Sequence, residues 1–289
     1  MKKNKNNISA LKSVRKYFFL VSRGLIELLQ KRLSDHNKCR LQNLANKIRY
    51  INDTFGYDPE MEYFYVKNES QKIFFPHSTR GFRIFANGII ARGEVLAKSY
   101  FVDLINFDNS DIVIDCGANT GDLMIFLKSK IREHNYHAFE PSSAEFQCIR
   151  YNYPTAHCYD IALSRDSEEH VFYIASETAD SSLIQPPSYT ATKRVRTSRL
   201  DDVKALDSIK SIKLLKIEAE GAEPEVLLGA EQTLKKCIFI AVDGGPERGI
   251  LQESTFKDVE TILIGSGFSL VKSDHSRSRA LFARADSHL

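Results

Sequence analysis

The sequence has no pair of closely spaced cysteines. Its five cysteines are scattered over 289 residues, are odd in number and form no Cys-x-x-Cys motif. This distribution argues against a disulfide scaffold and a zinc site, and it predicts reduced thiols in a cytoplasmic protein. Internal repeats and low-complexity tracts are missing as well. With 43% hydrophobic residues, the chain can bury one sizeable core with an appended segment.

Long hydrophobic runs are also missing. The apolar stretch at residues 17–21 resembles the core of a signal peptide, but Arg23 and Glu27 interrupt it and no convincing cleavage site follows. We therefore expect no secretion signal, and the stretch is too short to span a bilayer. Two interpretations stay open: a basic amphipathic helix on an anionic membrane surface, or a helix that is solvated or packed on a partner.

Positive charge is concentrated at the N-terminus. Residues 1–50 contain thirteen Lys or Arg and two acids, a net charge of +11, which leaves −8 for the remainder of a chain whose total is +3. The acidic body is not that of a nucleic-acid-binding protein. The basic helical arm at 1–50 is a candidate for peripheral contact with the inner face of a membrane.

From residue 111 onward, apolar strands alternate with helical patterns. This alternation predicts an α/β domain over 111–289, a doubly wound, Rossmann-like sheet that is mostly parallel and ends in an antiparallel hairpin. The predicted strands are 111–116, 135–140, 155–159, 212–218, 237–243, 268–273 and 279–284, and the predicted helices are 120–131, 142–152, 223–235 and 253–266.

Two further segments accompany this domain. Residues 51–110 predict an extension that packs on the core, with a hairpin at 61–75 and a helix at 91–106. Residues 165–205 predict a β insertion beside the ligand edge of the sheet. The insertion is either a lid or substrate wall, or a simple extension of the sheet.

The first strand of the domain ends in a glycine-rich turn, Asp115-Cys-Gly-Ala-Asn-Thr-Gly121. Ligands of open α/β sheets bind at the carboxyl ends of strands, where such a turn lies. The Gly-x-x-x-Gly spacing lacks the third glycine of a dinucleotide fingerprint. The Asp115 carboxylate would repel a phosphate and attract a sulfonium group, so the turn favours S-adenosylmethionine over NAD. The candidate cofactor residues here are Asp115, Cys116, Gly117, Asn119 and Gly121.

Acids also follow the next two strands. Glu140, followed by Pro141, can accept hydrogen bonds from ribose hydroxyls. Asp160 can accept a bond from an adenine amino group, with Ile161 packed on the ring, although an Asp at this place is also an ordinary turn former. Cys116 is expected to be a small packing residue.

Charged residues crowd the end of the strand at 212–218. Lys216, Glu218 and Glu220 are candidate catalytic residues, since charges at the end of a buried strand need a partner or a ligand. Glu218 or Glu220 could act as a general base, and Glu218 with Asp243 could instead bind a divalent cation. Alternatively, these charged residues have only a structural role, as an acid pair at a helix N-terminus together with a Lys–Glu bridge. The turn at 243–249 offers Glu247 and Arg248 as contacts for an acceptor.

The order of these motifs resembles the FkbM-type methyltransferase family. The matching segments are 115–121, 139–141, 160–163, 197–201, 215–223 and 228–231. The resemblance implies methyl transfer from S-adenosylmethionine, usually to a hydroxyl of a sugar or natural product. Glu218 stands where the family usually has Asp, so that the carboxylate extends one methylene further. The resemblance does not cover the basic arm.

We therefore expect an O-methyltransferase with a small-molecule, glycan or glycolipid acceptor. The alternatives are a non-catalytic nucleoside-binding adaptor and, less favoured, an NAD-dependent oxidoreductase. An adaptor would have little need for both the cofactor acids and the glutamate cluster.

Overall fold

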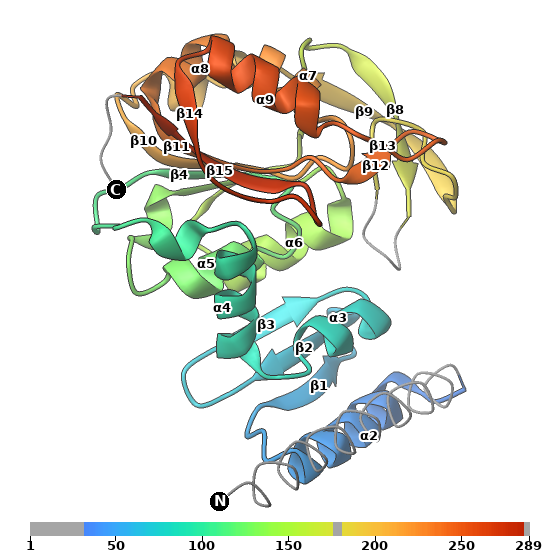
Figure 1. Cartoon of the computed structure of the whole chain (residues 1–289). Helices are drawn as coiled ribbons and strands as arrows, with labels where there is room; N and C mark the ends of the chain where they lie inside the picture. The colour runs from blue at the N-terminus through green and yellow to red at the C-terminus, as the bar shows by residue number, and fades with distance from the viewer. Residues whose placement is uncertain (1–31, 176–180, 286–289) are drawn as a thin grey trace, which may run out of the picture.

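A seven-stranded sheet, in the upper part of Figure 1, forms the core of the larger unit of the molecule. The computed structural model describes residues 32–175 and 181–285. The strand order is β14-β15-β11-β10-β4-β5-β6, in which β15 runs antiparallel to both of its neighbours and the other pairs are parallel. This is the strand order of a class I methyltransferase fold. The strands are β4 (Val113–Cys116), β5 (Tyr136–Phe139), β6 (His157–Tyr159), β10 (Ile212–Ile217), β11 (Cys237–Asp243), β14 (Phe268–Asp274) and β15 (Arg279–Arg284).

Helices cover both faces of this sheet. Successive residues of a strand point to opposite faces, so Leu214 packs in one apolar cluster and Leu215 in the other. One face is covered by α5 (Asp122–Leu127) and α6 (Ser143–Asn152), and the other by α7 (Glu223–Leu228), α8 (Glu231–Lys236) and α9 (Phe256–Gly265) (Figure 1). A short 3-10 helix, Glu133–Asn135, precedes β5.

All seven predicted strands of the sheet are confirmed, and their ends differ from the prediction by at most two residues. The helix predicted at 223–235 is wrong in one respect, because it is divided into α7 and α8. At the division, a Cβ on Gly229 would lie 2.0 Å from the Ser164 carbonyl oxygen, so the chain there is packed tightly against a neighbouring loop. The helix predicted at 253–266 begins later, since residues 253–254 belong to a small hairpin of β12 (Pro246–Arg248) and β13 (Glu253–Ser254).

The residues before the central sheet fold into a smaller unit. The predicted hairpin consists of β2 (Tyr63–Lys67) and β3 (Lys72–Phe75), and a strand that the sequence pattern did not predict, β1 (Thr54–Asp58), pairs with β2. The helices are α2 (Asp35–Ile48), α3 (Ser78–Ile84) and α4 (Ile89–Ser99), followed by the 3-10 helix Val102–Leu104. The helical prediction for 1–50 is confirmed over α2, while its residues 1–31 lie outside the described part of the chain.

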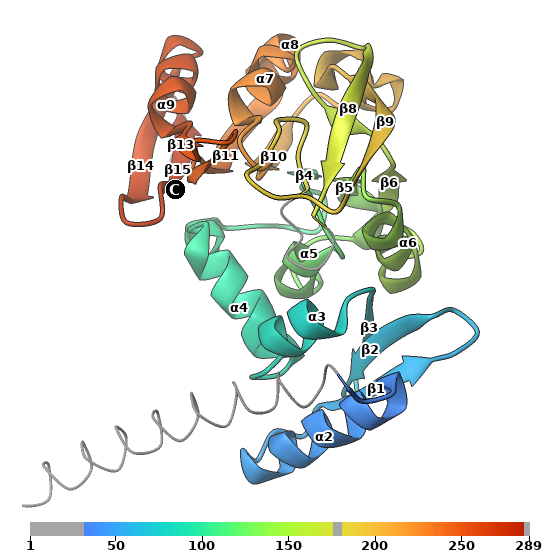
Figure 2. The same ribbon diagram turned by 90° about the vertical axis from the view of Figure 1, so that its right-hand side faces the viewer.

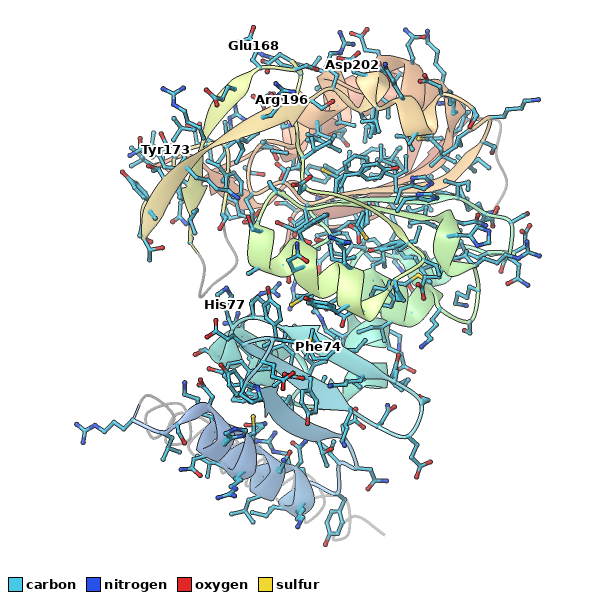
Figure 3. The ribbon with its side chains drawn as sticks, turned by 180° about the vertical axis from the view of Figure 1, so that it is seen from behind. Phe74, His77, Glu168, Tyr173, Arg196 and Asp202 are labelled. Carbon is cyan, nitrogen blue, oxygen red and sulfur yellow. The ribbon has the colours of Figure 1, made fainter. Side chains whose placement is uncertain are left out.

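Side-chain bonds tie these elements together. The Asn43 amide of α2 donates to the Phe55 carbonyl oxygen at 2.8 Å and accepts from the Phe55 N–H at 2.7 Å. The Asn152 side chain of α6 makes the same paired contact with the backbone of Phe74 at 2.7 and 3.0 Å. Phe74 and His77 lie on the side of the small unit that faces α6 (Figure 3). The unit therefore lies against the sheet face covered by α5 and α6 (Figure 2).

The insertion forms a sheet of its own. Strand β8 (Glu169–Ile174) pairs antiparallel with β9 (Ala191–Ser198), and β9 pairs in parallel with β7 (Ala162–Leu163). The alternative of a simple extension of the central sheet is wrong, because β7, β8 and β9 have no partner in it among the described strands. Two 3-10 helices, Leu200–Asp202 and Lys204–Leu206, lead from β9 to β10.

Over the ranges 32–175 and 181–285, no helix combines the length and hydropathy that a membrane span requires.

Candidate functional site

A cavity opens at the carboxyl ends of β4, β5 and β10. Its wall includes apolar side chains from the central sheet and from the insertion, four glutamates, and one residue of α3. The lining residues are Arg80, Cys116, Gly117, Asn119, Phe139, Glu140, Pro141, Ser142, Glu145, Ile161, Ala162, Leu163, Phe172, Ser181, Ser182, Leu183, Glu218, Ala219, Glu220 and Ala222. Because Phe172 and residues 181–183 are among them, the insertion is a wall of this cavity.

The glycine turn after β4 packs directly against the end of β10. Gly117 has a φ of +72°, and a Cβ there would lie 1.8 Å from the Glu218 carbonyl oxygen. Glycine is therefore required at this position by backbone approach to β10, in addition to any approach to a ligand. Gly121, with a φ of +80°, starts α5.

Asp115 does not face the cavity, and this corrects the electrostatic argument made from the sequence. Its side chain is 1% exposed and is absent from the described lining residues. Its carboxylate accepts a 2.5 Å bond from the Tyr136 hydroxyl and lies 3.0 Å from the Lys216 Nζ. Burial raises the pKa of Asp115, and Lys216 opposes that rise. Because Lys216 compensates the carboxylate, Asp115 cannot by itself repel a phosphate or attract a sulfonium group.

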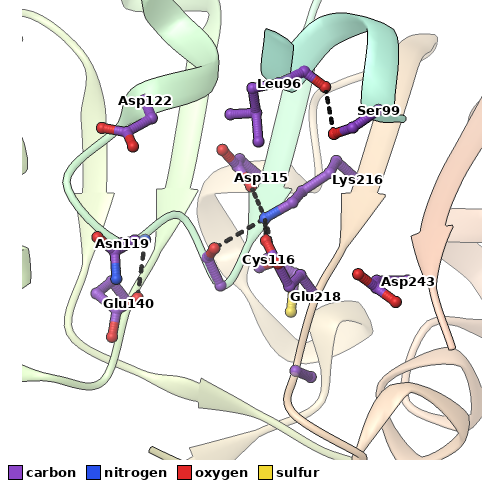
Figure 4. A network of polar contacts seen from close by, with 12 residues as sticks. Leu96, Ser99, Asp115, Cys116, Asn119, Asp122, Glu140, Lys216, Glu218 and Asp243 are labelled. Carbon is purple, nitrogen blue, oxygen red and sulfur yellow. Dashed lines mark hydrogen bonds and ion pairs between the residues drawn. The ribbon is translucent and has the colours of Figure 1, made fainter. Parts of the chain in front are cut away.

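Lys216 links the first and fourth parallel strands of the sheet. Its Nζ lies 3.0 Å from both Asp115 Oδ1 and Glu218 Oε2 (Figure 4). The same Nζ donates to the Gly117 carbonyl oxygen at 2.8 Å. Nζ also donates to the Cys116 carbonyl oxygen at 3.4 Å, so two carboxylates and two backbone carbonyls surround the ammonium group. Burial opposes the charge, but the two carboxylates outweigh it and raise the pKa of Lys216. The geometry makes Lys216 a positioning residue that holds the glycine turn beside Glu218.

Glu140 forms the cavity wall at the end of β5. Its carboxylate is held by two backbone amides, with Asn119 N–H donating at 2.9 Å and Ser142 N–H at 2.8 Å. Burial raises the pKa of Glu140 to about 7, although these two bonds favour the ionised form. Pro141 lies next to it in the lining. A carboxylate accepts about four hydrogen bonds, so Glu140 keeps capacity for donors from a ligand.

The remaining cofactor candidates lie in different places. Ile161 and Cys116 line the cavity, and burial raises the pKa of the Cys116 thiol, which stays protonated at neutral pH. Asp160 is exposed and is not among the described lining residues. The adenine contact predicted for Asp160 stays a prediction.

The carboxylates considered for a metal are paired with an arginine. The Arg279 side chain donates from Nε to Asp243 Oδ2 at 2.5 Å, and its Nη2 lies 4.0 Å from Glu218 Oε1. Burial opposes the ionisation of Glu218, but Lys216 outweighs it and the pKa falls to about 2. The described residues contain no group of three or more candidate metal ligands. The guanidinium therefore supplies the positive charge that a divalent cation would bring to this pair.

The turn after β10 places Glu220 in the wall of the cavity. The Ser182 hydroxyl of the insertion donates to the Glu220 carbonyl oxygen at 2.7 Å. Glu223 stabilises the same turn, because its Oε1 accepts hydrogen bonds from the Ala219 N–H at 2.9 Å and from the Gly221 N–H at 3.1 Å. Glu218 and Glu220 thus both line the cavity, at a turn whose backbone amides are held by Glu223.

The second glycine-rich turn contributes less to the cavity than the sequence suggested. Arg248 donates to both oxygens of Glu225, at 2.9 and 2.7 Å, and to the Gly221 carbonyl oxygen at 2.6 Å. Neither Arg248 nor Glu247 is among the described lining residues. Burial, together with Asp243 and Glu218, raises the pKa of Glu247 to about 8.

Arg80 is a lining residue that the sequence did not indicate. It belongs to α3, and its Nη1 donates to Asn119 Oδ1 at 2.6 Å. Thirty-nine residues separate the two partners along the chain. Nothing in the sequence of this short helix distinguishes Arg80 from Arg83, so the contact with Asn119 becomes visible only in the folded structure.

A curated protein is similar to part of this chain. "Methyltransferase 1" of Beauveria bassiana (strain ARSEF 2860) is 23% identical over 183 residues, which cover 53% of this chain and 74% of that protein.

Two solved structures are also similar. The FkbM methyltransferase from Methylobacillus flagellatus KT has a TM-score of 0.40 and 15% identity, over 63% of this chain and 45% of that one. This chain thus spans less than half of that protein. The magnesium protoporphyrin IX methyltransferase from Synechocystis PCC 6803, solved with bound SAM, has a TM-score of 0.39 and 11% identity, over 71% of this chain and 90% of that one.

A model of the methyltransferase FkbM domain matches residues 115–270. The match takes in the glycine turn, Glu140, the insertion and the turn after β10, and it covers more than half of the chain. The protein is therefore a member of the FkbM methyltransferase family.

Proposed function

We propose that this methyltransferase moves a methyl group from S-adenosylmethionine to a hydroxyl oxygen of a glycan, a glycolipid or a natural product. The observation that carries the proposal is the cavity, which joins a buried acid at the end of β5 to two glutamates at the end of β10. Class I folds bind nucleoside ligands at these strand ends.

The lining residues fit S-adenosylmethionine in shape and charge. Phe139, Ile161 and Leu163 offer apolar surface for an adenine, and Glu140 offers carboxylate oxygens for ribose hydroxyls. Lys216 compensates the charge of Glu218, and the other three glutamates of the described lining, Glu140, Glu145 and Glu220, suit a ligand with two positive groups. When bound, the cofactor supplies an electrophilic methyl group.

Glu220 is the residue that we assign to the acceptor. Both glutamates at the end of β10 line the cavity, but Lys216 holds the Glu218 carboxylate in an ion pair and lowers its pKa to about 2 against the cost of burial. So low a pKa makes Glu218 a weak proton acceptor. Glu220 takes the proton of the acceptor hydroxyl, while Glu218 and Lys216 keep the turn in place.

The test is transfer of a labelled methyl group to a cell extract of glycans and lipids, read by mass spectrometry. Glu220→Gln is expected to lower transfer on the order of 100-fold. The same variant is expected to keep its affinity for S-adenosylhomocysteine within about threefold. If Glu220→Gln transfers methyl groups as fast as the wild type, Glu220 is not the base. Transfer to no acceptor, with cofactor binding intact, would support an adaptor instead.

The acceptor proposal extends to the basic N-terminal segment. Residues 1–31 hold eight Lys or Arg and one acid, and we propose that they keep the enzyme at an anionic inner membrane surface where glycolipid precursors are assembled. The deletion to test is 1–31 and not 1–50, because Asn43 of α2 holds β1 in place. Binding to anionic vesicles is expected to fall on deletion, and unchanged binding would contradict the proposal.

A further inference from the structure

The described charged residues of the cavity wall are acidic except for one. Among the described lining residues, Glu140, Glu145, Glu218 and Glu220 are acids and Arg80 is the one cation. Such a wall attracts positively charged groups of a ligand and repels negatively charged ones. A ligand that also carries a carboxylate therefore needs a cation at one place in this wall.

S-adenosylmethionine carries both kinds of charge. Its sulfonium and ammonium groups are positive, and its amino-acid carboxylate is negative. The glutamates suit the first two groups, and the carboxylate has Arg80 as its partner in the described lining. We propose that Arg80 binds the amino-acid carboxylate of the cofactor, an inference that rests on the function proposed above.

The position of Arg80 supports this role. Its Nη1 donates to Asn119 Oδ1 at 2.6 Å, and the Asn119 backbone N–H donates to Glu140 Oε2 at 2.9 Å. The arginine is thereby fixed to the same turn that holds the buried acid of the cavity. A guanidinium has five N–H donors, so the bond to Asn119 leaves donors for a carboxylate, which guanidinium binds with two parallel bonds.

Arg80 also comes from outside the segment that defines the family. The family match begins at residue 115, whereas α3 spans Ser78–Ile84. If Arg80 binds the cofactor, the small N-terminal unit completes the cofactor site as well as packing on α6.

The experiment compares two cofactor forms that differ only in this carboxylate. Calorimetry would measure the affinity of S-adenosylmethionine and of its decarboxylated form for the wild type, Arg80→Gln and Arg80→Lys. Arg80→Gln is expected to weaken binding of S-adenosylmethionine on the order of 10- to 100-fold and to leave the decarboxylated form within about threefold. Arg80→Lys is expected to be intermediate, because lysine keeps the charge without the planar fork.

The matched control is Arg83→Gln. Arg83 lies on the same helix and is exposed, and it is not among the lining residues. Its substitution is expected to change neither affinity. Equal weakening of both cofactor forms by Arg80→Gln would overturn the inference, because Arg80 would then only hold Asn119 in place. A wild-type protein that binds neither form would overturn the proposed cofactor itself, which is a different failure.

Discussion

Replacing Lys216 by methionine is the most informative perturbation of the fold around the cavity. The Lys216 side chain is 4% exposed, and its Nζ lies 3.0 Å from two carboxylates, of which Asp115 is 1% exposed. Removing one partner of a buried ion pair leaves an uncompensated charge, at a cost of about 3–5 kcal/mol. This cost is a large part of the about 5–15 kcal/mol by which domains are stable.

The control is a lysine on the same strand. Lys213 is 21% exposed and lies 3.9 Å from the Asp111 carboxylate, in a pair near the surface. Lys213→Met is therefore expected to cost less than about 1 kcal/mol. The double variant Lys216→Met with Asp115→Asn removes both charges of the buried pair. We expect it to recover at least half of the unfolding free energy that Lys216→Met loses.

The stability lost in Lys216→Met should also depend on pH. Without Lys216, burial raises the pKa of Asp115 further above its ordinary value, so that the folded state takes up a proton that the unfolded state releases. Stability from that proton is present at low pH and is lost as the pH rises. The deficit of Lys216→Met should then be larger at pH 8 than at pH 5.

The assay is urea unfolding followed by circular dichroism, because the sequence has no tryptophan to report by fluorescence. A cost for Lys216→Met no larger than that for Lys213→Met would refute the reasoning. So would a deficit that grows as the pH is lowered.

Two other predictions concern stability. Gly117→Ala should destabilise the fold by roughly 2–3 kcal/mol in urea unfolding, because the new Cβ meets the Glu218 carbonyl oxygen at a positive φ. Gly265→Ala, where nothing lies within 4 Å, should be neutral or stabilising by up to about 1 kcal/mol, and equal losses at the two sites would contradict the packing argument. His137 is buried, and burial lowers its pKa to about 4 from 6.5, so stability should fall as the pH drops from 6.5 to 4, by at most about 3 kcal/mol. His137→Phe should remove that slope, and an unchanged slope would show that other groups cause it.

The central sheet could be predicted from the sequence because its strands are buried on both faces. Leu214 and Leu215 are both fully buried, and such apolar runs are visible without any contact information. β1 and the hairpin of β12 and β13 were missed. The two halves of the helix at 223–235 carry one continuous helical pattern, and the close approach of Gly229 to Ser164 at the break between them is not local in sequence.

The sequence predicted which residues line the cavity better than it predicted what each residue does. Glu140, Glu218 and Glu220 were predicted from the sequence because each lies at or just after the end of a predicted strand, and all three line the cavity. The sequence assigned Asp115 to the cofactor, since nothing local indicates that Tyr136 and Lys216 occupy its carboxylate. Arg80 depends on how α3 packs, which no motif encodes.

Binding of S-adenosylhomocysteine, measured by calorimetry, tests most directly whether the cavity holds the cofactor. The wild type should bind it with one site. Glu140→Gln should bind at least about tenfold more weakly, since a buried carboxylate that accepts from the ligand is lost. Glu145→Gln changes another lining acid, equally 6% exposed, and should stay within about threefold. Absence of binding to the wild type, or equal affinity of Glu140→Gln and the wild type, would contradict the assignment of this cavity to the cofactor.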